Sequence, residues 1–171
     1  MSRKDFYWKI AYLGASLAMF MVDQVTKAWA IRKLRFGGDR TIIDGFLNFV
    51  YVENPGVAFS QLQDGGDFRR YALSGLALLA ATAVMYYFWR VPRTNDRLLG
   101  ALALLFAGIL GNVTDRLRLG FVIDWIQVHY QDWYYPVFNI ADSAICVGAF
   151  LLIIDMFFSK KTEEKNADEK E

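Results

Sequence analysis

The sequence predicts an all-α integral membrane protein, with four transmembrane helices and a small extracytoplasmic antiparallel β-sheet that forms a cradle. The first reason is composition, since 55% of the 171 residues are hydrophobic and 16% are aromatic, well above the apolar share of an ordinary soluble domain. The second is that the apolar residues gather in four runs, each near the ~20 residues that cross ~30 Å of hydrocarbon. The polar stretches between the runs have the aromatic and β-branched residues typical of strands.

We expect one domain at residues 1–159, followed by a charged cytoplasmic tail at 160–171. The tail is dense in mixed charge and lacks large apolar residues, which is typical of a solvated, disordered end. The four expected helices are 8–31, 71–89, 98–114 and 138–158, and the extracytoplasmic insertion is 32–69.

Two charges, Asp23 and Lys27, interrupt the first apolar run. They stand four residues apart and so share one helical face, with the acid on the favourable N-terminal side of the base. An internal ion pair would ease their insertion into the membrane. The alternative is that Asp23 begins a loop, but the apolar character continues to Ile31.

The insertion between the first and second runs has the pattern of strands. Residues 41–43 and 46–52 are rich in β-branched and aromatic side chains, and an Asp-Gly pair typical of hairpins lies between them. Pro55 and Gly56 then end the second strand, because proline lacks an N–H donor and glycine allows positive φ. Residues 57–60 could begin a short helix on the bilayer, so that the insertion forms a cradle and lid over a groove.

The third run carries one polar face, since Asn112, Asp115 and Arg116 fall at i, i+3 and i+4. Polar residues inside a membrane usually face the interior of a helix bundle and mark function. For Asp115 we favour a structural ion pair with Arg116 or Arg118.

Residues 121–130, in the second polar insertion, are also strand-like and place Asp124 on a strand at the membrane face. His129, the only histidine, is expected at the surface and not as a catalytic base. The aromatic residues of this insertion suit the belt that such side chains form at a membrane interface. They are Trp125, Tyr130, Trp133, Tyr134 and Tyr135.

Asn139 and Asp142 stand three residues apart at the start of the fourth run. Asn139 could cap that helix, and the positive end of the helix dipole would then stabilise an ionised Asp142. Asp124 would be left as the partner that carries a proton.

Asp124 and Asp142 could together form an aspartyl dyad. Two carboxylates a few ångströms apart cannot readily both ionise, so the pair holds one shared proton near neutral pH. The ionised acid can then draw a proton from a water while the protonated acid donates to a peptide carbonyl, which leads to amide hydrolysis. From these residues alone two alternatives stay open: a small proton-coupled transporter or channel, and ordinary ion pairing.

Other chemistries find little support. The formal net charge of +1 provides no field for nucleic acid. Cys146 is the only cysteine, so it can form neither an intramolecular disulfide nor a cysteine-based metal site. No spacing of acids and histidine supports another metal site, and we expect neither a metal nor a cofactor. The distribution of Lys and Arg favours both termini on the inside by a small margin.

Five motifs cover nearly the whole chain. They are Asp-Gln-Val-Thr-Lys at 23–27, Asn-Pro-Gly-Val-Ala-Phe-Ser at 54–60, Gly-Ile-Leu-Gly-Asn-Val-Thr-Asp-Arg at 108–116, Val-Ile-Asp at 122–124 and Phe-Asn-Ile-Ala-Asp-Ser at 138–143. This set resembles the motifs of the lipoprotein signal peptidase family, also called signal peptidase II. The resemblance implies a bacterial aspartyl endopeptidase that removes the signal peptides of prolipoproteins, cutting before a cysteine that carries diacylglycerol.

The resemblance also implies roles for individual residues. Asp124 and Asp142 become the catalytic pair, and Asp23 and Lys27 a supporting pair. The residues that it implies as lining or supporting the site are Asn54, Asn112, Arg116 and Asn139, and those at positions of close backbone approach are Gly56, Gly108, Gly111 and Gly120.

The resemblance further implies a multi-pass protein of the bacterial cytoplasmic (inner) membrane. Both termini would lie in the cytoplasm, with the site facing the periplasm or cell exterior. We expect lipidated prolipoprotein and membrane lipids as partners, and a monomer.

Overall fold

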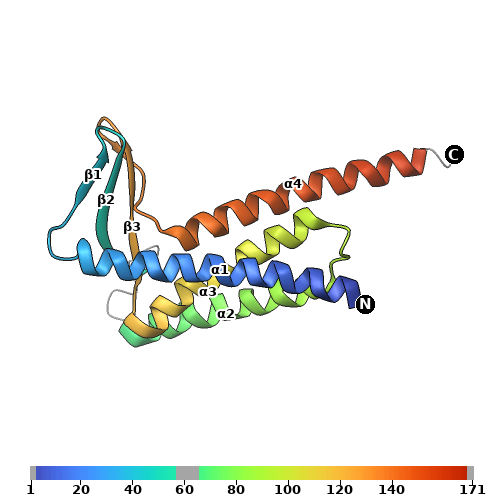
Figure 1. Ribbon diagram of the computed structural model, residues 1–171, viewed down its shortest axis with the longest axis horizontal. Coiled ribbons are helices and arrows are strands. Elements are labelled where there is room, and N and C mark those ends of the chain that lie inside the picture. The colour runs from blue at the N-terminus through green and yellow to red at the C-terminus, as the bar shows by residue number, and fades with distance from the viewer. Residues whose placement is uncertain (1–2, 57–65, 169–171) are drawn as a thin grey trace.

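Four long helices run beside one another, with a small sheet across one end. The computed structural model describes residues 3–56 and 66–168. The helices are α1 (Arg3–Lys33), α2 (Gly66–Arg90), α3 (Asp96–Leu119) and α4 (Ile140–Asp168). In Figure 1, α1 begins and α4 ends at the end of the bundle opposite the sheet.

Three of the described helices are long and apolar enough to cross a membrane. These spans are Asp67–Arg90, Asp96–Leu119 and Ile140–Phe158. The fourth helix, α1, has 31 residues and is therefore about 46 Å long at ~1.5 Å per residue. It is long enough to cross a membrane, but it carries buried charges, among them Lys9, Asp23 and Lys27.

Local chemistry sets the ends of α3, which is longer than the predicted 98–114. The side chain of Asn95 accepts a hydrogen bond from the backbone N–H of Leu98, which caps the start of the helix. At the other end Gly120 has φ 89° and ends the helix in the left-handed conformation that glycine adopts at low cost. Gly120 therefore serves as a helix cap and not, as expected, as a point of close backbone approach.

The last helix extends well past the predicted boundary at residue 158. It continues through Asp168, so the prediction of a disordered tail from residue 160 is wrong for residues 160–168. These residues include three Lys, two Glu and one Ala, which are good helix formers. A run of charged residues can therefore continue a helix.

The sheet has four antiparallel strands in the order β1-β2-β3-β4. They are β1 (Arg40–Ile43), β2 (Leu47–Asn54), β3 (Val122–Tyr130) and β4 (Trp133–Tyr134). The expected hairpin joins β1 and β2. The predicted helix at residues 57–60 falls outside the described residues.

The pairing of β2 with β3 brings the two polar insertions together. Val52 lies opposite Asp124, and Asn54 lies opposite Val122. Asn54 and Asp124 are therefore diagonal neighbours across the two strands, within reach of each other's side chains.

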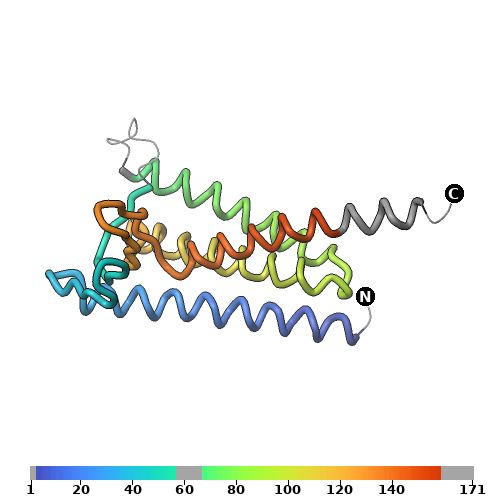
Figure 2. Tube along the Cα trace, turned by 90° about the horizontal axis from the view of Figure 1, so that it is seen from above, coloured from blue at the N-terminus to red at the C-terminus, as the bar shows by residue number. Residues whose placement is uncertain are grey.

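Helix α3 is the centre of the bundle and contacts each of the other three helices. Figure 2 shows α1 and α2 on opposite sides of it. Its backbone meets that of α4 closely, because a Cβ atom on Gly108 would lie 2.4 Å from the carbonyl oxygen of Ala141. Small residues at such positions let membrane helices approach each other.

A cluster of aromatic side chains fixes the sheet to the end of α1. The ring of Trp125 lies 5.6 Å from that of Trp29 and 4.9 Å from that of Phe49, all edge to face. Because Trp125 is only 7% exposed, its assignment to an interface belt is wrong. The other four aromatic residues assigned to that belt are exposed: Tyr130, Trp133, Tyr134 and Tyr135.

Candidate active site

The start of α4 is built by a reciprocal pair of hydrogen bonds between Asn139 and Asp142. The backbone N–H of Asp142 donates to Oδ1 of Asn139 at 2.8 Å. In return, the backbone N–H of Asn139 donates to Oδ2 of Asp142 at 3.2 Å. This is the arrangement of a capping box, so Asp142 is held in the first turn of its helix, where the helix dipole favours an anion.

The side chain of the same asparagine reaches Asp124. Its Nδ2 donates to Oδ1 of Asp124 at 2.7 Å, to the carbonyl of Ile123 at 3.2 Å and to Oδ1 of Asn112 at 3.1 Å. Asn139 is fully buried, so these partners fix its amide. A single residue therefore binds both predicted catalytic carboxylates, one through its backbone and one through its side chain.

The two carboxylates each receive a further amide donor. Nδ2 of Asn54 donates to Oδ2 of Asp124 at 2.9 Å, and the backbone N–H of Gly56 donates to Oδ1 of Asn54 at 2.8 Å. Nδ2 of Asn112 donates to Oδ1 of Asp142 at 2.7 Å. The structure therefore brings together Asp124, Asp142 and three of the predicted supporting asparagines.

A buried ion cluster lies behind the asparagines. The ammonium of Lys27 lies 2.9 Å from Oδ2 of Asp23 and 2.9 Å from Oδ2 of Asp115, and it donates to Oδ1 of Asn112 at 3.0 Å. Lys27, Asp23 and Asp115 are each at most 2% exposed. The expected pair of Asp23 and Lys27 is present, but the base that pairs with Asp115 is Lys27 and not Arg116 or Arg118.

The cluster also holds backbone on both sides of the dyad. Oδ1 of Asp23 accepts from the N–H of Ala141 at 2.9 Å, next to Asp142. Oδ2 of Asp115 accepts from the N–H of Ile123 at 3.2 Å, next to Asp124. The two acids that flank Lys27 thus position the neighbours of the two dyad residues.

Close packing at Gly111 makes room for this cluster. A Cβ atom at Gly111 would lie 2.6 Å from Oδ2 of Asp23 and 3.0 Å from the Cβ of Ala141. Both distances are too short for a side chain. The position predicted for close approach is therefore one where α3 meets a carboxylate of α1.

Sequence reasoning missed Gln24. Its amide donates to Oδ2 of Asp23 at 3.2 Å, to the carbonyl of Gly111 at 3.3 Å and to Oδ1 of Asp115 at 3.2 Å. The signal was present, since Gln24 is part of the first motif, but periodicity gives no reason to expect one glutamine to bond both acids.

Arg116 lies at the edge of the dyad on α3. Its guanidinium interacts electrostatically with Asp142 and Asp124, and its buried Nε has no hydrogen-bond partner among the described residues. Arg116 and Asn112 form the polar end of a groove of about 320 Å³ between α2, α3 and α4. The remaining lining is apolar: Leu73, Leu76, Ala77, Ala80, Ile109 and Ile145.

The two acids of the dyad differ in their surroundings. Burial raises the pKa of Asp124 to about 6, and hydrogen bonds from Asn54 and Asn139 oppose that rise while the nearby charge of Asp142 adds to it. Asp124 is 1% exposed, whereas Asp142 is partly exposed at the helix start. Asp124 thus has the properties of the acid that keeps a proton more readily.

The prediction that His129 lies at the surface is wrong. It is 9% exposed and stacks on Tyr134 with ring centroids 4.9 Å apart. Among the described residues, no three His, Cys, Asp or Glu side chains gather as a metal site would require.

Comparison with known proteins assigns this arrangement to a family. The model of the family described as signal peptidase (SPase) II matches residues 15–158, which include the sheet and both residues of the dyad. The chain belongs to the signal peptidase II family. The resemblance seen in the motifs is confirmed, together with the function that it implies, removal of signal peptides from lipoproteins, and nothing in the comparisons supports a transporter or channel.

Curated relatives and a solved structure match this chain over most of its length. The lipoprotein signal peptidase of Pseudoalteromonas atlantica is 43% identical, with 88% of this chain and 92% of the relative covered. That of Acinetobacter baumannii is 41% identical, with 93% and 90% covered. A solved structure described as a bacterial membrane enzyme, at 2.3 Å resolution, is 30% identical with a TM-score of 0.77 and 90% of each chain covered. The protein is thus a bacterial membrane protease.

Proposed function

We propose that this signal peptidase is an aspartyl endopeptidase whose catalytic pair is Asp124 and Asp142. Its substrate class is prolipoproteins that carry diacylglycerol on a cysteine, and the cut falls before that cysteine. The observation that carries the proposal is the binding of both carboxylates by Asn139, at 2.7 Å to Asp124 and at 3.2 Å to Asp142. No cofactor takes part.

The reaction divides between the two acids. Ionised Asp142 takes a proton from a water, whose oxygen forms a bond to the scissile carbonyl carbon while protonated Asp124 donates to the carbonyl oxygen. The product of this step is a tetrahedral gem-diol. It collapses as the carbon–nitrogen bond breaks: the proton held by Asp142 passes to the leaving nitrogen, and one gem-diol hydroxyl returns its proton to Asp124, which leaves a carboxylic acid and restores the dyad.

The surrounding residues position the pair. Asn54 orients the carboxylate of Asp124 and Asn112 that of Asp142, because each amide donates to a carboxylate oxygen at under 3 Å. Asp23 and Lys27 act through the backbone at Ala141 and through Asn112. Gly56 fixes the amide of Asn54.

Arg116 and the groove serve the substrate. The groove between α2, α3 and α4 is apolar along its length and polar at the dyad end, which matches a signal peptide whose apolar segment lies in the bilayer and whose cut site lies at the membrane boundary. The unpaired Nε of Arg116 is available for a substrate carbonyl or a lipid headgroup oxygen.

Four transmembrane helices and a cytoplasmic location for both termini complete the proposal. Helix α1 is the fourth span, because Lys27 neutralises Asp23 within the bundle and because α1 runs along the other helices in Figure 2. The sheet and dyad then face the periplasm or exterior. The enzyme acts as a monomer.

Cleavage of a purified prolipoprotein tests the assignment. The wild-type enzyme should cut the diacylglyceryl form and leave the unlipidated form intact, whereas Asp124→Asn and Asp142→Asn should each lose at least a thousandfold in rate. Asp155→Asn is the matched control, since Asp155 is a buried acid of α4 that bonds Asn95, and it should retain activity. Full activity of either dyad variant would overturn the proposal.

A further inference from the structure

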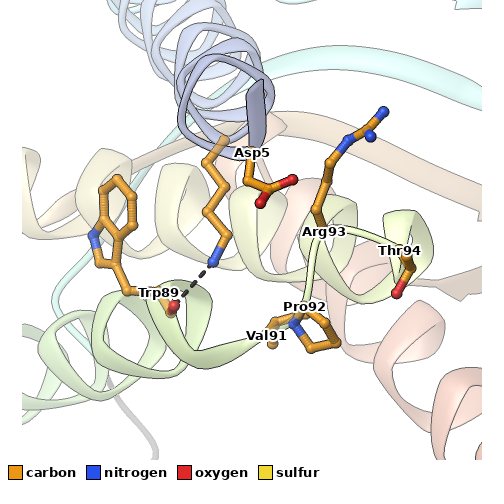
Figure 3. A pocket seen from close by; sticks show the side chains of 7 residues that line it. Asp5, Trp89, Val91, Pro92, Arg93 and Thr94 are labelled. Atoms are coloured by element: carbon orange, nitrogen blue, oxygen red, sulfur yellow. Dashed lines mark hydrogen bonds between the residues drawn. The ribbon is translucent and has the colours of Figure 1, made fainter. Parts of the chain in front are cut away.

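The end of the bundle opposite the dyad holds a cationic pocket that the peptidase reaction does not use. It is a cavity of about 400 Å³ between the start of α1 and the connection from α2 to α3. Its polar lining includes Lys9, Arg93, Thr94 and Asp5. Figure 3 shows the Asp5 carboxylate with Trp89 on one side and Arg93 on the other.

Lys9 is fixed deep in this pocket. It is 3% exposed, and its ammonium donates to the carbonyls of Phe88 at 3.0 Å and Trp89 at 2.9 Å. The carboxylate of Asp5, which lines the same pocket, interacts electrostatically with this ammonium. Arg93 adds a planar guanidinium, held at 5.0 Å over the ring of Trp8.

Charge at this end of the molecule is positive. Up to residue 158, bases outnumber acids on the adjoining parts of the helices and in the α2–α3 connection: Arg3, Lys4, Lys9, Arg90, Arg93 and Arg97 against Asp5, Asp96 and Asp155. Basic pockets between transmembrane helices suit the phosphate of anionic phospholipids.

An apolar groove continues from the same pocket. Trp89 lines both the cationic pocket and a groove of about 420 Å³ on α2 and α3, and that groove shares Met85, Phe106 and Leu110 with a further 320 Å³ against α1. From Leu78 to Trp89 it follows about 16 Å of α2 at ~1.5 Å per residue. This is about half of the ~30 Å hydrocarbon core, which is the depth of one leaflet.

Aromatic side chains mark the membrane boundary at the level of the cationic pocket. Tyr7, Trp8, Tyr86 and Tyr87 are all 47% or more exposed, as expected of residues at the boundary between headgroups and hydrocarbon. A molecule with an anionic phosphate at this level and an acyl chain of one leaflet would fill the pocket and the groove together.

We propose that the pocket of Lys9 and Arg93, with the groove along α2, is a binding site for an anionic glycerophospholipid of the cytoplasmic leaflet. The phosphate contacts the guanidinium of Arg93, the buried ammonium of Lys9 adds positive charge from deeper in the pocket, and one acyl chain lies over Met85, Phe106 and Leu110. The site is separate from the substrate groove, which opens between α2 and α4. The assignment to the cytoplasmic leaflet rests on the proposed orientation of the protein in the membrane. The choice of an anionic phospholipid rests on the pocket alone.

Native mass spectrometry of the detergent-solubilised full chain tests this site. During titration with phosphatidylglycerol or phosphatidylcholine, the wild type should bind one phosphatidylglycerol more tightly than phosphatidylcholine. Arg93→Gln should weaken phosphatidylglycerol binding on the order of tenfold, because a charge-assisted hydrogen bond is lost. Arg93→Lys should recover part of that loss.

Arg97→Gln is the matched control. Arg97 lies at the same end of the bundle but stacks at 4.8 Å on Phe158 and does not line the pocket. Equal loss with Arg97→Gln, or no loss with Arg93→Gln, would overturn the proposal. A thermal-shift assay compares phosphatidylglycerol with sn-glycerol 1-phosphate. Equal stabilisation by the two compounds would show a site for soluble phosphates and would also overturn the proposal.

The dyad provides an independent readout. Arg93→Gln should cut prolipoprotein at the wild-type rate in lipid-free detergent, because Arg93 lies at the opposite end of the bundle from Asp124. Failure of the lipid site would thus leave the peptidase assignment untouched, and failure of the peptidase assignment would leave lipid binding measurable.

Discussion

The side-chain amide of Asn139 donates a 2.7 Å hydrogen bond to Asp124 and lies one helical turn before Asp142, which it caps. The asparagine therefore has two separable duties. One is to start α4, which serine can also do, and the other is to reach Asp124, for which serine is too short.

Replacement of Asn139 by serine should separate these duties. Asn139→Ser should keep the cap but lose about a hundredfold in cleavage rate and some stability, because the buried amide contacts with Asp124, Ile123 and Asn112 are gone. Asn139→Ala should lose both the cap and the contact with Asp124, and the loss of the cap should lower the free energy of unfolding by about a further 1 kcal/mol. Thermal unfolding and cleavage rates of the two variants provide the comparison, and a fully active serine variant would show that the amide contact is dispensable.

The raised pKa of Asp124 predicts a dependence of stability on pH. Burial lifts this pKa from 3.8 to about 6, so between pH 4 and 6 the native state binds more protons than the unfolded state. Stability from this group is therefore fully present below about pH 4 and is lost as the pH rises to about 6, by roughly 3 kcal/mol. Asp124→Asn does not titrate, so its stability relative to wild type should rise over this interval. Parallel pH curves of the two proteins in thermal unfolding would contradict the raised pKa.

Lys27 is expected to matter for stability through the charges that it neutralises. Lys27→Met leaves the buried acids Asp23 and Asp115 facing each other without a cation, which should cost about 3–5 kcal/mol. The triple variant Asp23→Asn, Lys27→Met, Asp115→Asn removes the charges together and should recover part of the loss. Chemical unfolding in detergent measures both, and equal stability of the single and triple variants would refute the ion cluster as the cause.

Two glycines of α3 provide a matched pair. Gly111→Ala places a Cβ atom 2.6 Å from Asp23, whereas at Gly100 the nearest atom would be Cε1 of Tyr12 at 3.9 Å. Gly111→Ala should therefore displace the cluster and lower both stability and cleavage. Gly100→Ala should leave cleavage unchanged and stabilise the helix by up to about 1 kcal/mol. Similar behaviour of the two variants would mean that the packing at Gly111 is not critical.

Local patterns were sufficient to predict the elements that carry the dyad. The hairpin, the strand of Asp124 and the cap at Asn139 each follow from neighbours within a few residues. The aromatic and charged contacts of the interior were harder, because they join distant segments. Asp115 has two arginines close in sequence, yet its partner is Lys27 on another helix.

The predicted interface belt failed for a related reason. Trp125 alternates with residues of the same strand, but whether its face meets lipid or protein depends on where α1 ends. Only the placement of Trp29 beneath the sheet makes Trp125 a core residue.

The spacing of Asp23 and Lys27 also has a consequence for biosynthesis. In the proposed four-span topology, α1 leaves the ribosome before α3, so Lys27 would enter the bilayer before Asp115 and Asn112 have been made. Because its first partner lies four residues back on the same helix, α1 can insert already neutralised. The later arrival of α3 then converts a pair formed within one helix into the bridge that joins the first and third spans.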